Sequence, residues 1–174
     1  MALRTGRRWP WTALPEPPDP REFAPATILL ASEGGPIPPA AVEFAVRLAR
    51  NAQAPVHVLV IARIWGSAFG LPHPGLMPTK REWQRQRELV AEAVDRLKRR
   101  GVEVSGQVIS SRNAAKRILA EARRRGSEAV VMAAPAPRHW FVADFIWGQD
   151  PYRVRRRAKV PVYLVVESGG RIAR

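Results

Sequence analysis

The chain has 174 residues, 46% of them hydrophobic, and carries 29 Lys and Arg against 15 Asp and Glu. This length and hydrophobic fraction suffice for one buried core and exclude a wholly disordered chain. The formal net charge of +14 predicts a surface that attracts anions such as nucleic acid, anionic lipid or an acidic protein. Cysteine is absent, which excludes disulfides and Cys-ligated metal sites. No apolar run approaches the roughly 20 residues that a transmembrane segment needs.

The N-terminal segment is rich in proline and arginine. Its basic start is not followed by the apolar stretch of about 7–15 residues that a secretory signal requires. Instead, five prolines fall within residues 10–20, which favours an extended chain. We therefore expect residues 1–24 to form a flexible arm and the protein to be cytoplasmic. Alternatively, the arm packs on its own domain through Trp9 and Trp11.

After the arm, short apolar runs alternate with segments of helical periodicity. Residues 27–31 and 55–61 are apolar runs bounded by Pro or Gly, which is typical of buried strands. Between them, apolar residues recur at helical spacing over 39–51. A loop rich in Gly and Pro over 63–79 then leads to a longer amphipathic helix over 80–100.

The next segments continue the alternation. Residues 102–109 alternate between apolar and polar side chains and predict a third strand. A helix should follow over about 113–125, with Ser110 or Ser111 as its N-cap.

The C-terminal third predicts two more strands and a short helix. The strands are the apolar runs 129–133 and 160–166. An irregular segment over 135–148 separates them and leads into the helix, with Asp150 as the N-cap and Pro151 as the first helical residue.

Strands that alternate with helices predict an α/β fold, an open parallel sheet with helices on both faces. We expect this domain to span residues 25–167, followed by a polar tail over 168–174. In such sheets ligands bind beyond the carboxyl ends of the strands, where the strand order reverses. Here those ends are the loops after Ala31, Ile61, Ile109 and Ala133.

Three segments resemble stretches of one known family. Residues 28–35, Ile-Leu-Leu-Ala-Ser-Glu-Gly-Gly, are similar to its opening strand, which typically ends in an Asp-Gly-Ser turn. Residues 126–133 are similar to its Gly-Ala-Asp-Leu-Ile-Val-Met-Gly stretch, and residues 160–166 to its closing Cys-Pro-Val-Leu-Val-Val strand. In their order and spacing, these segments resemble the universal stress proteins over about residues 26–166.

The resemblance implies a three-layer α/β/α fold, Rossmann-like and similar to the adenine nucleotide alpha hydrolases. It implies a five-stranded parallel sheet of order 3-2-1-4-5 and a homodimer formed along the last strand. Many members bind ATP, whereas others bind no nucleotide. In the ATP-binding members, Gly-x2-Gly-x9-Gly-(Ser/Thr) follows the fourth strand. The glycines let the backbone approach the phosphates, and the last pair opens a helix whose amides face the anion.

The loop after the fourth strand departs from that motif. The first two glycine positions hold Ala133 and Ala136 or, aligned backwards from the fifth strand, Pro135 and Arg138. The prolines at 135 and 137 remove amides that could have held phosphate oxygens.

At the end of this loop, Gly148 matches the third glycine, but Gln149 replaces the hydroxyl residue. Asp150 then places a carboxylate near the phosphate position, where it would use the helix amides itself. Its repulsion of a phosphate would cost about 1 kcal/mol or more.

In the first loop, Glu33 stands where the family's nucleotide-contacting Asp would be. Ile61 could still provide an apolar wall for an adenine, and Arg138 and His139 could partly replace glycine amides. We expect the ATP site to be lost, so that no cofactor is bound; ATP binding through a non-standard loop is the alternative. If nucleotide binding is retained, the expected contacts are Ser32, Glu33, Ile61, Ala133, Arg138, Gly148 and Gln149.

Two further groups of residues form a candidate interaction patch. Trp140 and Phe141 exceed the family's apolar pattern and either pack in the core or dock on a protein or membrane surface. Basic residues crowd the last helix, where they complement the helix dipole or bind a polyanion or an acidic protein. These basic residues are Arg153, Arg155, Arg156 and Arg157.

The sequence offers little for catalysis or metal binding. His57 lies mid-strand, where we expect it to be buried and hydrogen-bonded, and His73 and His139 lie in separate loops. We therefore predict no catalytic residue, no metal site and no enzyme. The leading hypothesis is a stress-related, non-catalytic binding or regulatory module. The alternatives are an ATP-binding switch, or a basic adaptor that docks on a larger assembly, nucleic acid or membrane.

Overall fold

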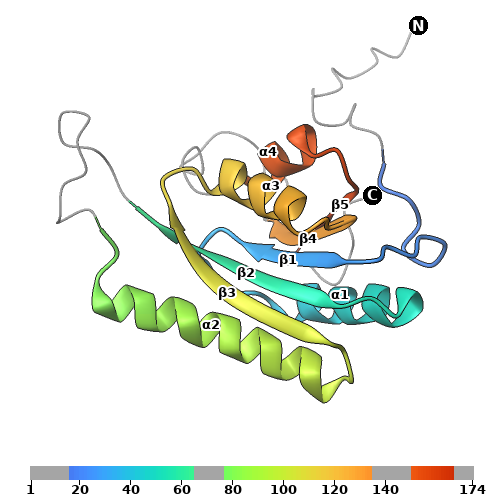
Figure 1. Cartoon of the computed structure of the whole chain (residues 1–174), viewed down its shortest axis with the longest axis horizontal. Coiled ribbons are helices and arrows are strands. Elements are labelled where there is room, and N and C mark those ends of the chain that lie inside the picture. The colour runs from blue at the N-terminus through green and yellow to red at the C-terminus, as the bar shows by residue number, and fades with distance from the viewer. Residues whose placement is uncertain (1–15, 65–76, 135–149, 167–174) are drawn as a thin grey trace, which may run out of the picture.

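A computed structural model describes residues 16–64, 77–134 and 150–166 of the chain (Figure 1). Five parallel strands form one sheet in the order β3-β2-β1-β4-β5. The strands are β1 (Ile28–Ser32), β2 (Val56–Arg63), β3 (Val104–Ser111), β4 (Ala129–Ala134) and β5 (Val162–Val166). The predicted fold class and strand order are confirmed.

Two helices cover each face of the sheet. The helices are α1 (Pro39–Ala52), α2 (Lys80–Arg99), α3 (Ala114–Arg124) and α4 (Asp150–Arg157). Figure 1 shows α1 and α2 on one side of the sheet and α3 and α4 on the other. Helix α2 packs on β2 and β3, whereas α3 and α4 pack against each other. The arrangement is the expected three-layer sandwich.

The core consists of two apolar clusters, one on each face of the sheet. Alternate residues of β2 serve the two clusters because side chains along a strand point to opposite faces. Val58 and Val60 belong to the cluster beneath α1 and α2, whereas Leu59 and Ile61 belong to the cluster beneath α3. This burial on both faces accounts for the continuous apolar run of the strand.

The predicted cap of the third helix is wrong. Asn113 is the N-cap, and its side chain accepts a hydrogen bond from the backbone N–H of Lys116 at 2.9 Å. Ser111 instead ends β3, and its hydroxyl accepts a hydrogen bond from the backbone N–H of Asn113 at 3.1 Å. The strand runs two residues further than its apolar pattern, so the helix begins later.

Part of the expected arm packs on the domain. Phe23 packs against the core cluster beneath α1, and the hydroxyl of Tyr163 in β5 donates to the carbonyl of Pro18 at 3.0 Å. The contacts of the domain therefore begin before the predicted boundary at residue 25. The two arm tryptophans lie outside the described residues.

Candidate functional site

The strand order reverses between β1 and β4, so the carboxyl ends of these strands mark the expected ligand position. Ala31 of β1 pairs with Met132 of β4, which makes Ser32 and Ala133 the next residues on the two neighbouring strands. These two predicted site residues therefore lie at the same edge of the sheet. The other predicted loop residues, Arg138, Gly148 and Gln149, and the aromatic pair Trp140 and Phe141, lie outside the described residues.

The hydroxyl of Ser32 closes the turn after β1. It accepts a hydrogen bond from the backbone N–H of Gly34 at 3.2 Å and donates to the carbonyl of Gly35 at 2.6 Å. Such local bonds are a common use of Ser in turns. Both bonds are made within the turn, so the hydroxyl of Ser32 already has an intramolecular donor and acceptor.

Gly34 brings this turn against the neighbouring strand β2. Its φ is +114°, and a Cβ at this position would lie 2.7 Å from the carbonyl oxygen of Ile61. Only glycine fits this conformation and this approach without strain. Ile61 itself exposes none of its surface, so its side chain belongs to the core.

Glu33 pairs with an arginine from β2. The Nη2 of Arg63 lies 2.7 Å from Oε2 of Glu33, and the Nε of the same arginine donates to the backbone carbonyl of Glu33 at 2.9 Å. Both side chains are about one-fifth exposed, at 20% and 21%. The carboxylate that should contact a nucleotide is thus neutralised from within the chain.

A glutamine from α2 binds the same turn. The Nε2 of Gln86 donates to the carbonyl of Gly34 at 3.1 Å. Sequence reasoning missed both Gln86 and Arg63. For Arg63, the only indication in the sequence was its charge, two positions after the apolar run that ends at Ile61. Nothing in the pattern of α2 marks Gln86.

A second polar cluster lies on the α3 side of β2 and β3. His57 is 8% exposed, and its Nδ1 lies 2.8 Å from Oγ of Ser105, so the prediction of a buried, hydrogen-bonded histidine is confirmed. Burial, reinforced by the charge of Arg125, lowers the pKa of His57 from 6.5 to about 4. The ring is therefore neutral at neutral pH.

The predicted basic residues of the last helix lie on α4. Arg153, Arg156 and Arg157 are exposed, and Arg155 is partly exposed. Val154, between them in sequence, is fully buried in the core. The helix thus directs its apolar side inward and leaves its guanidinium groups at the surface.

The sequence matches the model of the Universal stress protein family over residues 26–166. The chain belongs to the universal stress protein family. The match covers the whole sheet and all four helices, from β1 to the end of β5. No curated protein matches the sequence.

Solved universal stress protein structures share the fold. One from Burkholderia pseudomallei is 21% identical, with a TM-score of 0.58, 80% of this chain and 95% of that chain being covered. A universal stress protein from Archaeoglobus fulgidus in complex with dAMP is 18% identical, with a TM-score of 0.58 and coverage of 82% and 98%. Another, in complex with cAMP, is 18% identical, with a TM-score of 0.59 and coverage of 83% and 98%. At sequence identities this low, the structural similarity establishes the fold alone.

Two kinds of feature are absent from the described residues of this universal stress protein. None of their helices combines the length and apolar character needed to cross a membrane. Within the same residues, His, Asp and Glu side chains nowhere gather in a group of three or more that could hold a metal ion.

Proposed function

We propose that this universal stress protein is a non-catalytic binding or regulatory module whose nucleotide site is inactive. The supporting observation is the ion pair between Glu33 and Arg63, 2.7 Å apart at the carboxyl edge of the sheet. By its resemblance to the family, Glu33 holds the position from which a carboxylate would contact a nucleotide. Here that carboxylate binds a cation of its own chain.

The surrounding contacts oppose a rearrangement of the turn for a ligand. Ser32 closes it from within, Gln86 holds it from α2, and Gly34 rests on the backbone of β2. A nucleotide would have to replace the Glu33–Arg63 pair and displace a turn that is held by two sets of hydrogen bonds and by its close approach to β2. The sequence that follows β4 adds few glycine amides to offset that cost.

An ATP-binding switch is the second candidate. Two solved structures with this fold contain dAMP or cAMP, which favours nucleotide binding somewhere in the family. In this alternative, Arg63 would leave Glu33 when a nucleotide arrives and would pair with a phosphate instead. Arginine suits that role because its guanidinium binds phosphate oxygens in bidentate fashion.

The deciding experiment measures nucleotide in the purified full chain, by acid release and chromatography, and then titrates the protein with ATP and dAMP in a calorimeter. The Archaeoglobus fulgidus protein whose structure was solved in complex with dAMP serves as the positive control. We expect no released nucleotide and no binding heat from this chain, while the control binds. Nearly one adenine nucleotide per chain, or micromolar binding, would overturn the proposal and establish the switch.

We also propose that the module is a cytoplasmic homodimer joined along β5. Family resemblance supports the dimer, and β5 lies at one end of the sheet order. In the single chain, however, the residues of β5 are all buried, between 1% and 6% exposed. Light scattering coupled to size exclusion tests the dimer directly, because a monomeric mass at micromolar concentration would contradict it.

A further inference from the structure

The helical layer formed by α3 and α4 is strongly basic. These two helices together hold eight Lys or Arg and two Asp or Glu in their 19 residues. One of the two carboxylates, Glu121, is only 2% exposed. We use the term basic helical surface for six exposed side chains of this layer: Lys116, Arg117, Arg123, Arg124, Arg156 and Arg157.

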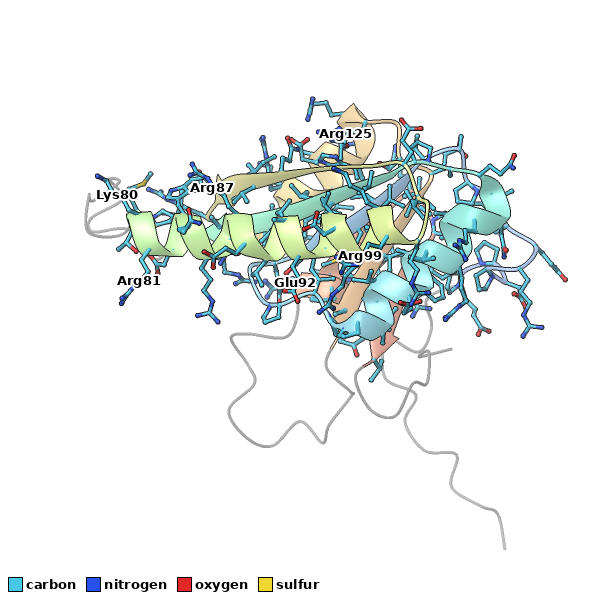
Figure 2. The ribbon with its side chains drawn as sticks, turned by 90° about the horizontal axis from the view of Figure 1, so that it is seen from below. Lys80, Arg81, Arg87, Glu92, Arg99 and Arg125 are labelled. Carbon is cyan, nitrogen blue, oxygen red and sulfur yellow. The ribbon has the colours of Figure 1, made fainter. Side chains whose placement is uncertain are left out.

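The opposite layer is far better balanced. Helices α1 and α2 hold nine Lys or Arg and five Asp or Glu in 34 residues. Ion pairs also engage some of these charges: Arg96 and Glu92 are 2.5 Å apart, and Glu43 of α1 lies 2.7 Å from Arg100, the C-cap residue of α2. Figure 2 views α2 from below and shows cations along the helix, with Glu92 among them. Among the four helices, net positive charge per residue is therefore higher on α3 and α4 than on α1 and α2.

Glu121 lies beneath the basic helical surface and forms ion pairs with two of its arginines. Its carboxylate lies 3.0 Å from Nη2 of Arg117 and 2.6 Å from Nη2 of Arg124, and the Nε of Arg125 is 3.9 Å away. Arg117 and Arg124 nevertheless keep 43% and 60% of their side chains exposed. A fixed arginine loses less conformational entropy when it binds a ligand, so this anchoring favours binding.

We propose that the basic helical surface binds the phosphate backbone of double-stranded nucleic acid without reading its sequence. The argument rests on charge complementarity, because a duplex is a dense and regular array of anions. Of the eight cations on α3 and α4, seven are arginines, whose forked donors suit phosphate oxygens. This surface lies on a helical layer, so the proposal does not depend on whether the carboxyl-edge site binds nucleotide.

Two observations favour a duplex over other polyanions. A helix that lies in a membrane surface needs exposed apolar residues. Among the described residues the only large exposed hydrophobic side chain is Met77, which belongs to neither α3 nor α4. Single strands need aromatic side chains for stacking. Tyr152, the one aromatic residue of these two helices, packs against the core.

The test measures the fluorescence anisotropy of a labelled, mixed-sequence DNA duplex titrated with the full chain. The key variant combines Lys116→Gln, Arg123→Gln, Arg156→Gln and Arg157→Gln. The matched control combines Arg81→Gln, Arg85→Gln, Arg87→Gln and Lys98→Gln on α2, where all four side chains are exposed. Both variants lower the net charge by the same amount, so only the position of the lost charge differs.

We expect the key variant to bind about tenfold or more weakly, and the control variant to change affinity less than about threefold. Between about 50 and 200 mM salt, the slope of log affinity against log salt should become shallower by about 3.6 in the key variant, which is about 0.9 for each lost phosphate contact. Circular dichroism confirms folding. If the fourfold variant does not fold, Lys116→Gln with Arg123→Gln alone should show about half of the change in slope.

Three outcomes would overturn the proposal. The first is that the unmodified chain does not bind the duplex. The second is an equal loss of affinity in both variants, which would show that binding depends on the net charge of the chain and not on this surface. The third is tighter binding to vesicles containing phosphatidylserine, or to polyglutamate, than to the duplex, which would assign the surface to a membrane or an acidic protein.

Discussion

Arg63 and Glu33 join the ends of two neighbouring strands through a contact of 2.7 Å between Nη2 and Oε2. Thirty residues separate them in sequence, yet the parallel pairing of β1 with β2 brings their backbones together. Within the candidate nucleotide site, the carboxylate of Glu33 is therefore neutralised by an ion pair and is not free to bind a ligand. The pair also connects the turn after β1 to the end of β2.

Replacing Arg63 with alanine should lower the free energy of unfolding by about 1 to 2 kcal/mol, because the pair is largely shielded from water. Urea denaturation of both proteins measures the difference. Arg81→Ala on the exposed start of α2 is the control and should change stability by less than about 0.5 kcal/mol. Equal effects of the two substitutions would show that the contact with Glu33 contributes nothing to stability.

Gly34 should not tolerate alanine, since its φ is +114° and a Cβ would lie 2.7 Å from the carbonyl oxygen of Ile61. We expect Gly34→Ala to destabilise the fold by about 2 kcal/mol, measured as a lower midpoint of denaturation. The neighbouring Gly35→Ala is the matched control, because a Cβ there meets nothing within 4 Å. A stability loss at Gly35 as large as that at Gly34 would contradict this account of the turn.

His57 should make the fold less stable in mild acid. Its pKa falls from 6.5 to about 4 on folding, chiefly through burial, so the unfolded chain binds the proton more tightly. Its contribution is fully present above pH 6.5 and declines as the pH falls towards 4, by about 2 to 3 kcal/mol at pH 4.5. Denaturant titrations at neutral pH and at pH about 4.5 measure it.

The control for this pH dependence is His57→Gln, which cannot titrate in this range. The variant should lose less stability than the unmodified chain on acidification, whatever its stability at neutral pH. Identical pH dependence in both proteins would show that another group is responsible.

Glu121 should matter far more for stability than an exposed carboxylate in a similar pair. Glu121→Gln leaves three arginines without their buried partner and should cost about 2 to 3 kcal/mol. Glu92→Gln breaks an exposed pair on α2 and should cost less than about 0.5 kcal/mol. Thermal unfolding of the two variants side by side measures the contrast, and similar melting temperatures would refute it.

The carboxylate of Glu121 also makes the stability of the fold depend on pH. A hydrogen bond from Arg124 is the main cause that holds the pKa of Glu121 below its usual value. Its stabilisation is therefore present above the ordinary glutamate pKa of about 4.3 and is lost as the pH falls below it. In Glu121→Gln the decline in stability below that pH should be smaller.

The order of strands and helices could be predicted because each element buries one periodic set of apolar residues. The errors fell at strand ends, where that periodicity stops. The second strand was expected to end at residue 61, yet Ala62 and Arg63 continue its pairing with Ser110 and Ser111 of β3. Hydrogen bonds to a neighbouring strand, which leave no apolar signature, extend the sheet there.

That error concealed the main feature of the candidate site. Counted as a loop residue, Arg63 had no defined position relative to Glu33. Gln86 was equally hidden, because its bond to Gly34 joins residues 52 positions apart. Contacts of this kind depend on how a helix lies over a turn, and a single sequence carries no pattern for them.

The hydrogen bond from Tyr163 to Pro18 joins the last strand to the segment that precedes the first, so both ends of the domain meet at one side of the sheet. The side chain of Tyr163 is almost fully buried, at 1% exposed. Removal of the segment around Pro18 would therefore leave a buried hydroxyl without this acceptor, which makes residues before the first strand part of what stabilises the last one.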